Sequence, residues 1–149
     1  MSKLDLYQVD SFTKKLFEGN PAGVIFSSEL NKNNMQQIAL ENNLSETAFV
    51  SKDDNGFNIK WFSPLMEIDL CGHATLAAAH IYFTEIDPEA KKISFNSNSG
   101  ILEVFKDDPY IYLDFPADFI EPIDIDDQLI KMLGKLPIEA YKGRDDFMC

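Results

Sequence analysis

Three side chains of this sequence could exchange protons with a bound molecule: Glu46, Cys71 and His73. Glu46 opens a segment of alternating pattern in which Ala48 and Val50 share its face, so its carboxyl group lies on an apolar surface. A carboxyl group that loses hydration there suits general acid–base chemistry. A carboxylate at the end of a strand can equally curl back to water, and the pattern leaves both interpretations open.

His73 lies at the beginning of an uncharged apolar segment. Residues 70–84 include no formally charged side chain, which predicts a helix that protein encloses on all sides. At about fifteen residues this helix is too short to cross a bilayer. In its first turn, His73 can donate to a substrate oxygen or assist a carboxyl group, or it is a satisfied core histidine.

Cys71 and His80 also have structural interpretations beside chemical ones. The beginning of a helix favours a thiolate, which would make Cys71 nucleophilic or basic, but cysteine is also a small buried hydrophobic residue. His80 is expected to face the same side as His73, two turns deeper, in a structural role. We expect no metal site, because His80 is the only further nearby Cys or His and zinc takes three or four ligands.

The N–H groups at the beginning of the predicted helix favour a bound anion. They are unpaired and carry a partial positive charge, which suits a carboxylate. We therefore expect Cys71, Gly72 and Ala74 to take part in substrate binding. Asn20 lies in the Gly-Asn-Pro-Ala-Gly segment at 19–23, which is predicted to be a turn. Its amide can hold a polar substrate group or bond the backbone of its own turn.

The remaining sequence predicts an α+β fold in which a mixed sheet rolls around the central buried helix. Strands supply apolar side chains at every second residue and can cover such a helix without polar cost. One further helix is predicted at 31–43, with asparagines suited to both of its ends. The predicted strands are residues 4–12, 24–26, 46–52, 57–62, 92–96, 101–106 and 110–115.

Residues 1–116 are expected to form one domain, and residues 117–149 the start of a second, truncated domain. The segment Pro-Ala-Asp at 116–118 breaks the strand pattern, and a short helix at 125–133 with a stop at Gly134 follows. Short strands are predicted at 137–142 and 146–149. A free strand of this kind needs a partner segment, either from the same protein or from another copy.

Composition and charge exclude several classes of partner. The chain has 149 residues, 45% of them hydrophobic, a net charge of −12 and a pI near 4.4. The acidic balance argues against nucleic acid and against anionic membranes. The two cysteines form no disulfide or zinc pattern, and the N-terminus has no secretory or transit character, so we expect a cytoplasmic protein. An uncovered apolar face predicts a homodimer.

Four segments, in this order, resemble the PhzF family of phenazine biosynthesis-like proteins. They are Val-Asp-Ser-Phe at 9–12, Gly-Asn-Pro-Ala-Gly-Val at 19–24, Asn-Leu-Ser-Glu-Thr-Ala-Phe-Val at 43–50, and Trp-Phe-Ser-Pro at 61–64 with Glu-Ile-Asp-Leu-Cys-Gly-His-Ala-Thr at 67–75. The resemblance implies a diaminopimelate epimerase-like fold. Members have two similar domains, each a sheet rolled around a helix, with the active site between them.

The resemblance also implies an activity and residue roles. It implies a cofactor-independent isomerase that shifts a proton within a small carboxylic acid. Glu46 would be the acid–base residue, His73 would assist it, and Asn20 would lie near the substrate. Related epimerases carry a catalytic cysteine at the position of Cys71, so a cysteine-based epimerase of an amino or hydroxy acid is an alternative.

The length of the chain bears on whether it acts alone. Members of the family are about twice as long, and a further catalytic carboxylate comes from their second domain. We therefore expect the chain to be incomplete as an enzyme unless the other half is supplied. A third interpretation is a non-catalytic binding or interaction protein built on half of the fold.

Overall fold

The computed structural model describes residues 3–117, 119–143 and 147–149. The chain divides into two compact units, Met1–Phe115 and Pro116–Cys149, and each is described by itself. Among the described residues, no helix is both long enough and apolar enough to cross a membrane.

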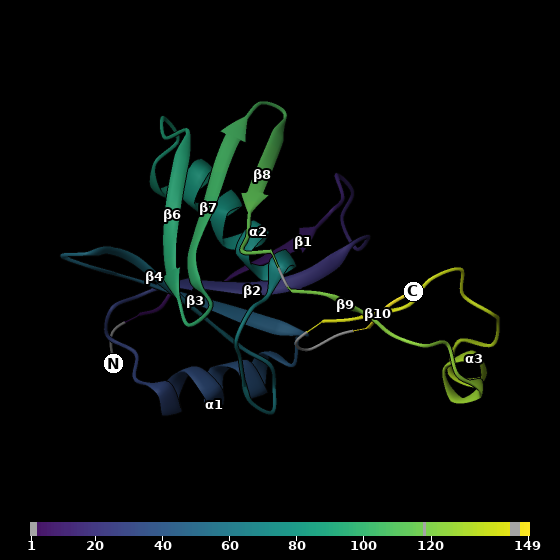
Figure 1. The fold of residues 1–149 in the computed structure, drawn as a ribbon. Helices are drawn as coiled ribbons and strands as arrows, with labels where there is room; N and C mark the ends of the chain where they lie inside the picture. The colour runs from purple at the N-terminus through teal and green to yellow at the C-terminus, as the bar shows by residue number, and fades with distance from the viewer. Residues whose placement is uncertain (1–2, 118, 144–146) are drawn as a thin grey trace. The chain divides into compact units, whose positions relative to one another are not determined.

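The first unit contains one mixed sheet with the strand order β1-β2-β3-β4-β6-β7-β8, and β5 pairs with β4 at its side (Figure 1). Neighbouring strands are parallel at β2–β3 and β4–β6 and antiparallel elsewhere. The predicted mixed sheet is therefore confirmed. Its strands are β1 (Tyr7–Ser11), β2 (Asn20–Phe26), β3 (Glu46–Asp53), β4 (Gly56–Phe62), β5 (Glu67–Ile68), β6 (Lys92–Ser97), β7 (Gly100–Asp107) and β8 (Tyr110–Asp114).

The sheet curls around the helix α2 (Gly72–Ile81), which continues as a short π-helical turn at Tyr82–Ile86 (Figure 1). Four alanines of α2 are fully buried, and their small side chains let strands from both ends of the sheet pack closely on the helix. This arrangement confirms the predicted α+β class with a central buried helix. The alanines are Ala74, Ala77, Ala78 and Ala79.

The enclosure of α2 is incomplete on one side, which corrects the expectation of a helix covered all round. A groove of about 530 Å³ between β1 and the beginning of β8 is lined by Leu76, Ala77 and His80 of the helix. His80 is exposed there rather than buried in the core. The physical reason is that β1 and β8 are the two edges of the sheet and do not pair with each other.

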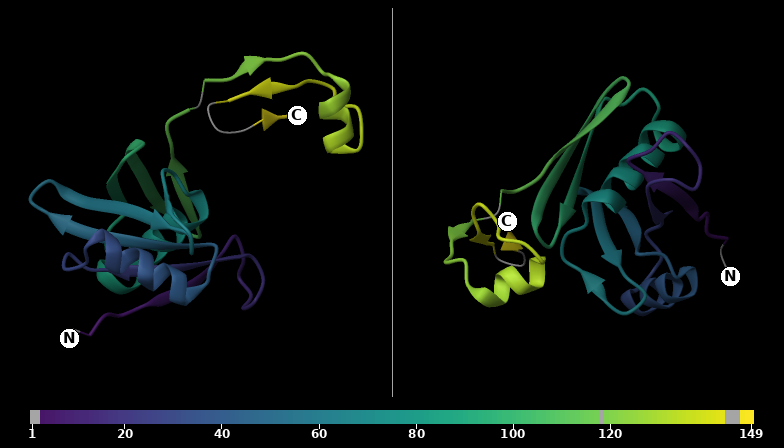
Figure 2. Two further views of the ribbon diagram at one scale, coloured as in Figure 1. Left: turned by 90° about the horizontal axis from the view of Figure 1, so that it is seen from below. Right: turned by 90° about the vertical axis from the view of Figure 1, so that its right-hand side faces the viewer.

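The helix α1 (Lys32–Asn42) covers the opposite face of β2 and β3 (Figures 1 and 2). The side chain of Asn31 accepts a hydrogen bond from the backbone N–H of Asn34 at 2.9 Å, and Asn43 ends the helix in the left-handed conformation. Both ends of the predicted helix are thereby confirmed. The small core beneath α1 consists of Ile25, Met35, Ala39, Phe49 and Phe62.

The segment 19–23 is not a turn, because β2 already begins at Asn20. Gly19 has φ of +96°, and a Cβ there would collide with the carbonyl oxygen of Ser11. A Cβ at Gly23 would come within 3.0 Å of the hydroxyl oxygen of Thr47. The two glycines therefore serve the close packing of β2 between β1 and β3, a role that short-range turn chemistry does not reveal.

The second unit is a small three-stranded antiparallel sheet with the order β11-β10-β9 and one helix. The helix α3 (Asp127–Leu133) ends at Gly134, where φ is +71°, as the sequence predicts. It begins two residues later than predicted, because the side chain of Asp126 caps it. The strands are β9 (Glu121–Pro122), β10 (Tyr141–Lys142) and β11 (Phe147–Met148). β10 and β11 are shorter than the strands predicted at 137–142 and 146–149, and β9 was not predicted. Asp146 lies outside the described residues.

Candidate functional site

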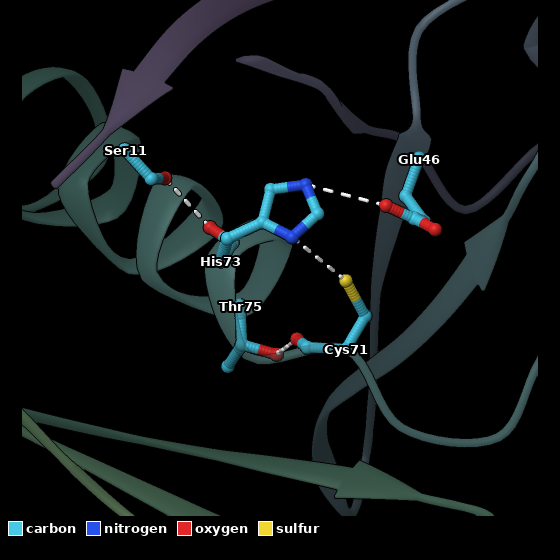
Figure 3. A network of polar contacts seen from close by, with 5 residues as sticks. All are labelled: Ser11, Glu46, Cys71, His73 and Thr75. Atoms are coloured by element: carbon cyan, nitrogen blue, oxygen red, sulfur yellow. Dashed lines mark hydrogen bonds and ion pairs between the residues drawn. The ribbon is translucent and has the colours of Figure 1, made fainter. Parts of the chain in front are cut away.

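Glu46, Cys71 and His73 come together at the beginning of α2 (Figure 3). Oε2 of Glu46 lies 3.3 Å from Nε2 of His73, and Sγ of Cys71 lies 3.4 Å from Nδ1 of the same ring. The imidazole thus lies between the carboxylate and the thiol, with one nitrogen facing each. The structure brings together the three side chains that the sequence singled out for proton exchange.

Glu46 reaches this site because it is the first residue of β3. In the sheet it is opposite Ala22 of β2, and it shares the inner face of β3 with Ala48 and Val50, which pack in the core around α2. The Glu46 side chain is 20% exposed. The carboxyl group therefore does not curl back into open solvent, which was the alternative interpretation from the sequence.

The backbone at the beginning of α2 is held by two hydroxyl groups (Figure 3). Ser11 donates its hydroxyl to the carbonyl oxygen of His73 at 2.8 Å, and Thr75 donates to the carbonyl oxygen of Cys71 at 2.6 Å. Sequence reasoning did not identify these two residues. Thr75 has the recognisable spacing of four residues after Cys71 within a helix, whereas the Ser11 contact depends on tertiary structure.

Burial raises the pKa of the Cys71 thiol to about 11. The charge of Glu46 and its hydrogen bond with the thiol act in the same direction, while the nearby backbone N–H groups of Ala74 and His73 act against it. At neutral pH the group is consequently a thiol. Of the two interpretations that the sequence left open for Cys71, burial therefore favours a small buried residue over a thiolate, because desolvation outweighs the helix N–H groups.

Nε2 of His73 is a buried polar atom with no hydrogen-bond partner among the described residues. It is 3.3 Å from Oε2 of Glu46, but the two groups are not aligned as a hydrogen bond requires. The side chain of His73 is only 10% exposed. Buried ring nitrogens are normally paired, so this atom has hydrogen-bonding capacity that the described residues leave unused.

The predicted binding residues lie around the same end of the sheet. Asn20 pairs with Ser11 of β1. The partner of Glu46 in β2 is Ala22, two residues after Asn20, so Asn20 lies on the same face of β2 as Ala22 and at the end of the strand where Glu46 lies. Gly72 is half-buried. The side chain of Ala74 is fully buried, so only its backbone N–H, which lies near the Cys71 sulfur, can contribute to binding.

The donor atoms of Glu46, Cys71 and His73 all lie within 4.8 Å of one another. The expectation of no metal site rests on the number of nearby cysteines and histidines and does not include the carboxylate of Glu46. The two nitrogens of one imidazole face two different partners here, whereas ligands of one ion must point to a common centre. This arrangement suits proton exchange better than metal binding, and the absence of a metal stays a prediction.

The chain is similar to known proteins over nearly all of its length. The family described as phenazine biosynthesis-like protein (PhzC-PhzF) matches residues 9–124. A protein of Pseudomonas aeruginosa named an uncharacterized isomerase is 41% identical over 147 residues, which cover 98% of this chain and 56% of that protein. The mouse phenazine biosynthesis-like domain-containing protein 1 is 41% identical, covering 97% of this chain and 54% of that protein.

Solved structures show the same likeness. The crystal structure of a PhzF family protein of Enterococcus faecalis matches with a TM-score of 0.86 and 45% identity, covering 97% of this chain and 55% of that one. The chain thus spans about half the length of the relatives that it matches. It has the diaminopimelate epimerase-like fold that these proteins share. On the family match and these identities, the chain belongs to the phenazine biosynthesis-like PhzF family.

Proposed function

We propose that this chain provides the acid–base half of an isomerase active site, in which Glu46 moves a proton within a small carboxylic acid. The observation that carries the proposal is the enclosed approach of Oε2 of Glu46 to Nε2 of His73 at 3.3 Å. Because Nε2 has no hydrogen-bond partner among the described residues, a polar atom of the substrate would complete its environment.

The proton transfer balances with Glu46 alone. Its carboxylate takes a proton from a carbon of the substrate, and the electron pair of the broken C–H bond moves into the conjugated system of the acid. Glu46 then returns the proton to a different carbon. Substrate and product contain the same atoms at the same oxidation level, and a positioned acid–base group contributes on the order of 10²–10⁴ in rate.

His73 assists through Nε2 in this scheme. The nitrogen can donate to a substrate oxygen that gains negative charge, or exchange a proton with Glu46. We assign the substrate carboxylate to the N–H groups at Gly72 and its neighbours, because the beginning of a helix stabilises anions. Asn20, at the same end of β2, would bind a further polar substituent.

The class of reaction is supported by the relatives. The matching Pseudomonas aeruginosa protein is named an isomerase. The chain spans about half of that protein's length, so the proposal extends to the complete active site, to which the rest of a full-length protein would contribute groups. Independence of cofactors is part of the same proposal, since the proton transfer above needs none.

The state of Cys71 favours Glu46 over the cysteine as the base. An epimerase that used Cys71 would need its thiolate near neutral pH. Burial raises the pKa of this thiol to about 11, and Glu46 lies close enough to oppose a second negative charge.

A pair of matched substitutions tests the proposal in the full-length protein. A panel of small conjugated and hydroxy carboxylic acids is incubated in deuterated water, and mass spectrometry measures deuterium uptake and isomerisation. Glu46→Gln should lower turnover of the active acid about 10²–10⁴-fold with binding retained. Glu41→Gln, which changes an exposed carboxylate of α1, should have no effect.

Two outcomes would reject the assignment. Full activity in Glu46→Gln would show that another group moves the proton. Binding of carboxylic acids without turnover or deuterium uptake in the full-length protein would favour the non-catalytic binding protein instead.

A further inference from the structure

We infer that Cys71 is a positioning residue, whose S–H group donates to Nδ1 of His73 and thereby keeps the ring proton on Nε2, facing Glu46. The inference rests on the proposed function for its consequence in catalysis. The hydrogen-bond arrangement itself can be tested without any turnover.

The contact between thiol and ring is direct. Sγ of Cys71 lies 3.4 Å from Nδ1 of His73, within the range for a hydrogen bond that involves sulfur. Figure 3 shows the ring placed between the two partners, with Nδ1 toward the sulfur and Nε2 toward the carboxylate. Cys71 is itself buried, at 7% exposed, so solvent does not replace the thiol as the partner of Nδ1.

The number of protons then selects one tautomer. A neutral imidazole carries a single N–H, on either Nδ1 or Nε2. Burial keeps Cys71 in its thiol form, so the thiol has one proton to donate. Glu46 also attracts this proton, but the hydrogen-bond contact of Sγ is the one to Nδ1 at 3.4 Å, so we place the proton there. The ring proton is consequently on Nε2.

The electrostatics at the other nitrogen favour the same tautomer. Nε2 lies 3.3 Å from Oε2 of Glu46. A lone pair on Nε2 would face the carboxylate and be repelled by it, whereas an N–H at that position is attracted. The contacts at both nitrogens therefore agree, and Cys71 acts on the reaction through His73 rather than on the substrate.

The backbone positions of both residues do not depend on the thiol. Ser11 and Thr75 hold the carbonyl groups of His73 and Cys71, at 2.8 and 2.6 Å. A substitution of the cysteine side chain should therefore change the tautomer more than it moves the ring.

Nitrogen-15 NMR of the histidine side chains tests the inference on the 149-residue chain. The chain contains two histidines, and His80→Gln removes the signals of the exposed one, so His73 is assigned directly. In the unsubstituted chain we expect Nε2 to carry the proton and Nδ1 to be the hydrogen-bond acceptor.

The substitutions at Cys71 separate hydrogen bonding from packing. Cys71→Ser keeps a donor and should preserve the tautomer. Cys71→Ala removes the donor and should reduce the ratio of the two tautomers about fivefold, the effect of one net hydrogen bond. Cys71→Val, which fills the space without a donor, should behave like the alanine variant, so a fold defect specific to either one does not decide the result.

Two results would overturn the inference: a ring proton on Nδ1 in the unsubstituted chain, or an unchanged tautomer ratio in both Cys71→Ala and Cys71→Val. These are distinguishable from failure of the proposed function. If Glu46→Gln abolishes turnover but substitutions at Cys71 leave the tautomer ratio unchanged, only the positioning role of Cys71 is rejected. If the tautomer ratio responds to the Cys71 substitutions as expected but Glu46→Gln remains active, only the proposed function is rejected.

Discussion

The polar groups at the beginning of α2 differ in how deeply they are buried. Cys71 is the most enclosed, His73 is intermediate, and Glu46 is the most exposed of the three. A molecule that enters the site therefore meets the carboxylate before it meets the thiol. This order agrees with a base at Glu46 and with an indirect role for Cys71.

The buried thiol makes a testable contribution to stability at high pH. Its pKa is raised from 9.0 to about 11 in the folded chain, so between these values the unfolded state releases a proton that the folded state keeps. The contribution of this thiol to the free energy of unfolding is fully present below pH 9. It should fall by about 1 kcal/mol per pH unit as the pH rises toward 11.

Urea unfolding at a series of pH values measures this effect. Other groups also titrate in that range, so the quantity of interest is the difference between the unsubstituted chain and Cys71→Ala. That difference should shrink between pH 9 and pH 11. A difference that is constant over this interval would contradict a buried thiol with a raised pKa.

At the scale of secondary structure, Gly19, which directly precedes β2, contributes packing that its sequence context hides. Gly19 has a positive φ, and a Cβ there would also collide with Ser11. Gly100 has a positive φ as well, at +107°, but no atom lies within 4 Å of a Cβ placed there. These two glycines form a matched pair for separating backbone strain from collision.

We expect Gly19→Ala to destabilise the chain more than Gly100→Ala does. Backbone strain costs about 1–3 kcal/mol at either position, and displacement of β1 from β2 adds to this at Gly19 alone. Thermal or urea unfolding of both variants gives the comparison. Equal losses of stability would show that the packing of Gly19 against Ser11 is unimportant.

Local signals in the sequence predicted those elements whose environment is local or periodic. The asparagine caps defined the helix α1, and the alternating pattern placed Glu46 on the face of Ala48. The uncharged run predicted the buried helix α2. The beginning of β2 was predicted wrongly, because the glycines at 19 and 23 were taken for turn formers, whereas they allow close contact between strands.

The composition of the site could be predicted only in part. Glu46 and His73 are distant in sequence, and their contact depends on the curl of the whole sheet around α2. The resemblance to a family supplied that pairing, whereas the residues alone supplied candidates. The raised pKa of Cys71 and the bond from Ser11 depend on burial and tertiary structure, which no local pattern encodes.

At the scale of the whole molecule, the second unit has little core of its own. Among the described side chains of this unit, Ala140 is the one buried hydrophobic residue, while Ile138 is 97% exposed and Met132 and Leu136 are also exposed. Several exposed apolar side chains in so small a unit favour association with another protein surface. We propose a homodimer in which these side chains are covered.

Sedimentation of matched variants tests the dimer. The chain should sediment with twice its mass of 16.9 kDa, and Ile138→Ser combined with Met132→Ser should shift it toward the monomer. Leu65→Ser changes a residue of the first unit that is 87% exposed, and it should leave the dimer intact. A monomeric unsubstituted chain, or equal effects of all variants, would contradict this proposal.

The central claim is that a carboxylate, rather than a thiolate, moves the proton. Deuterium uptake by the active carboxylic acid, measured side by side for Glu46→Gln and Cys71→Ser in the full-length protein, tests it most directly. We expect uptake to be lost in Glu46→Gln and retained in Cys71→Ser. Uptake that survives in Glu46→Gln and disappears in Cys71→Ser would contradict it and identify a cysteine-based epimerase.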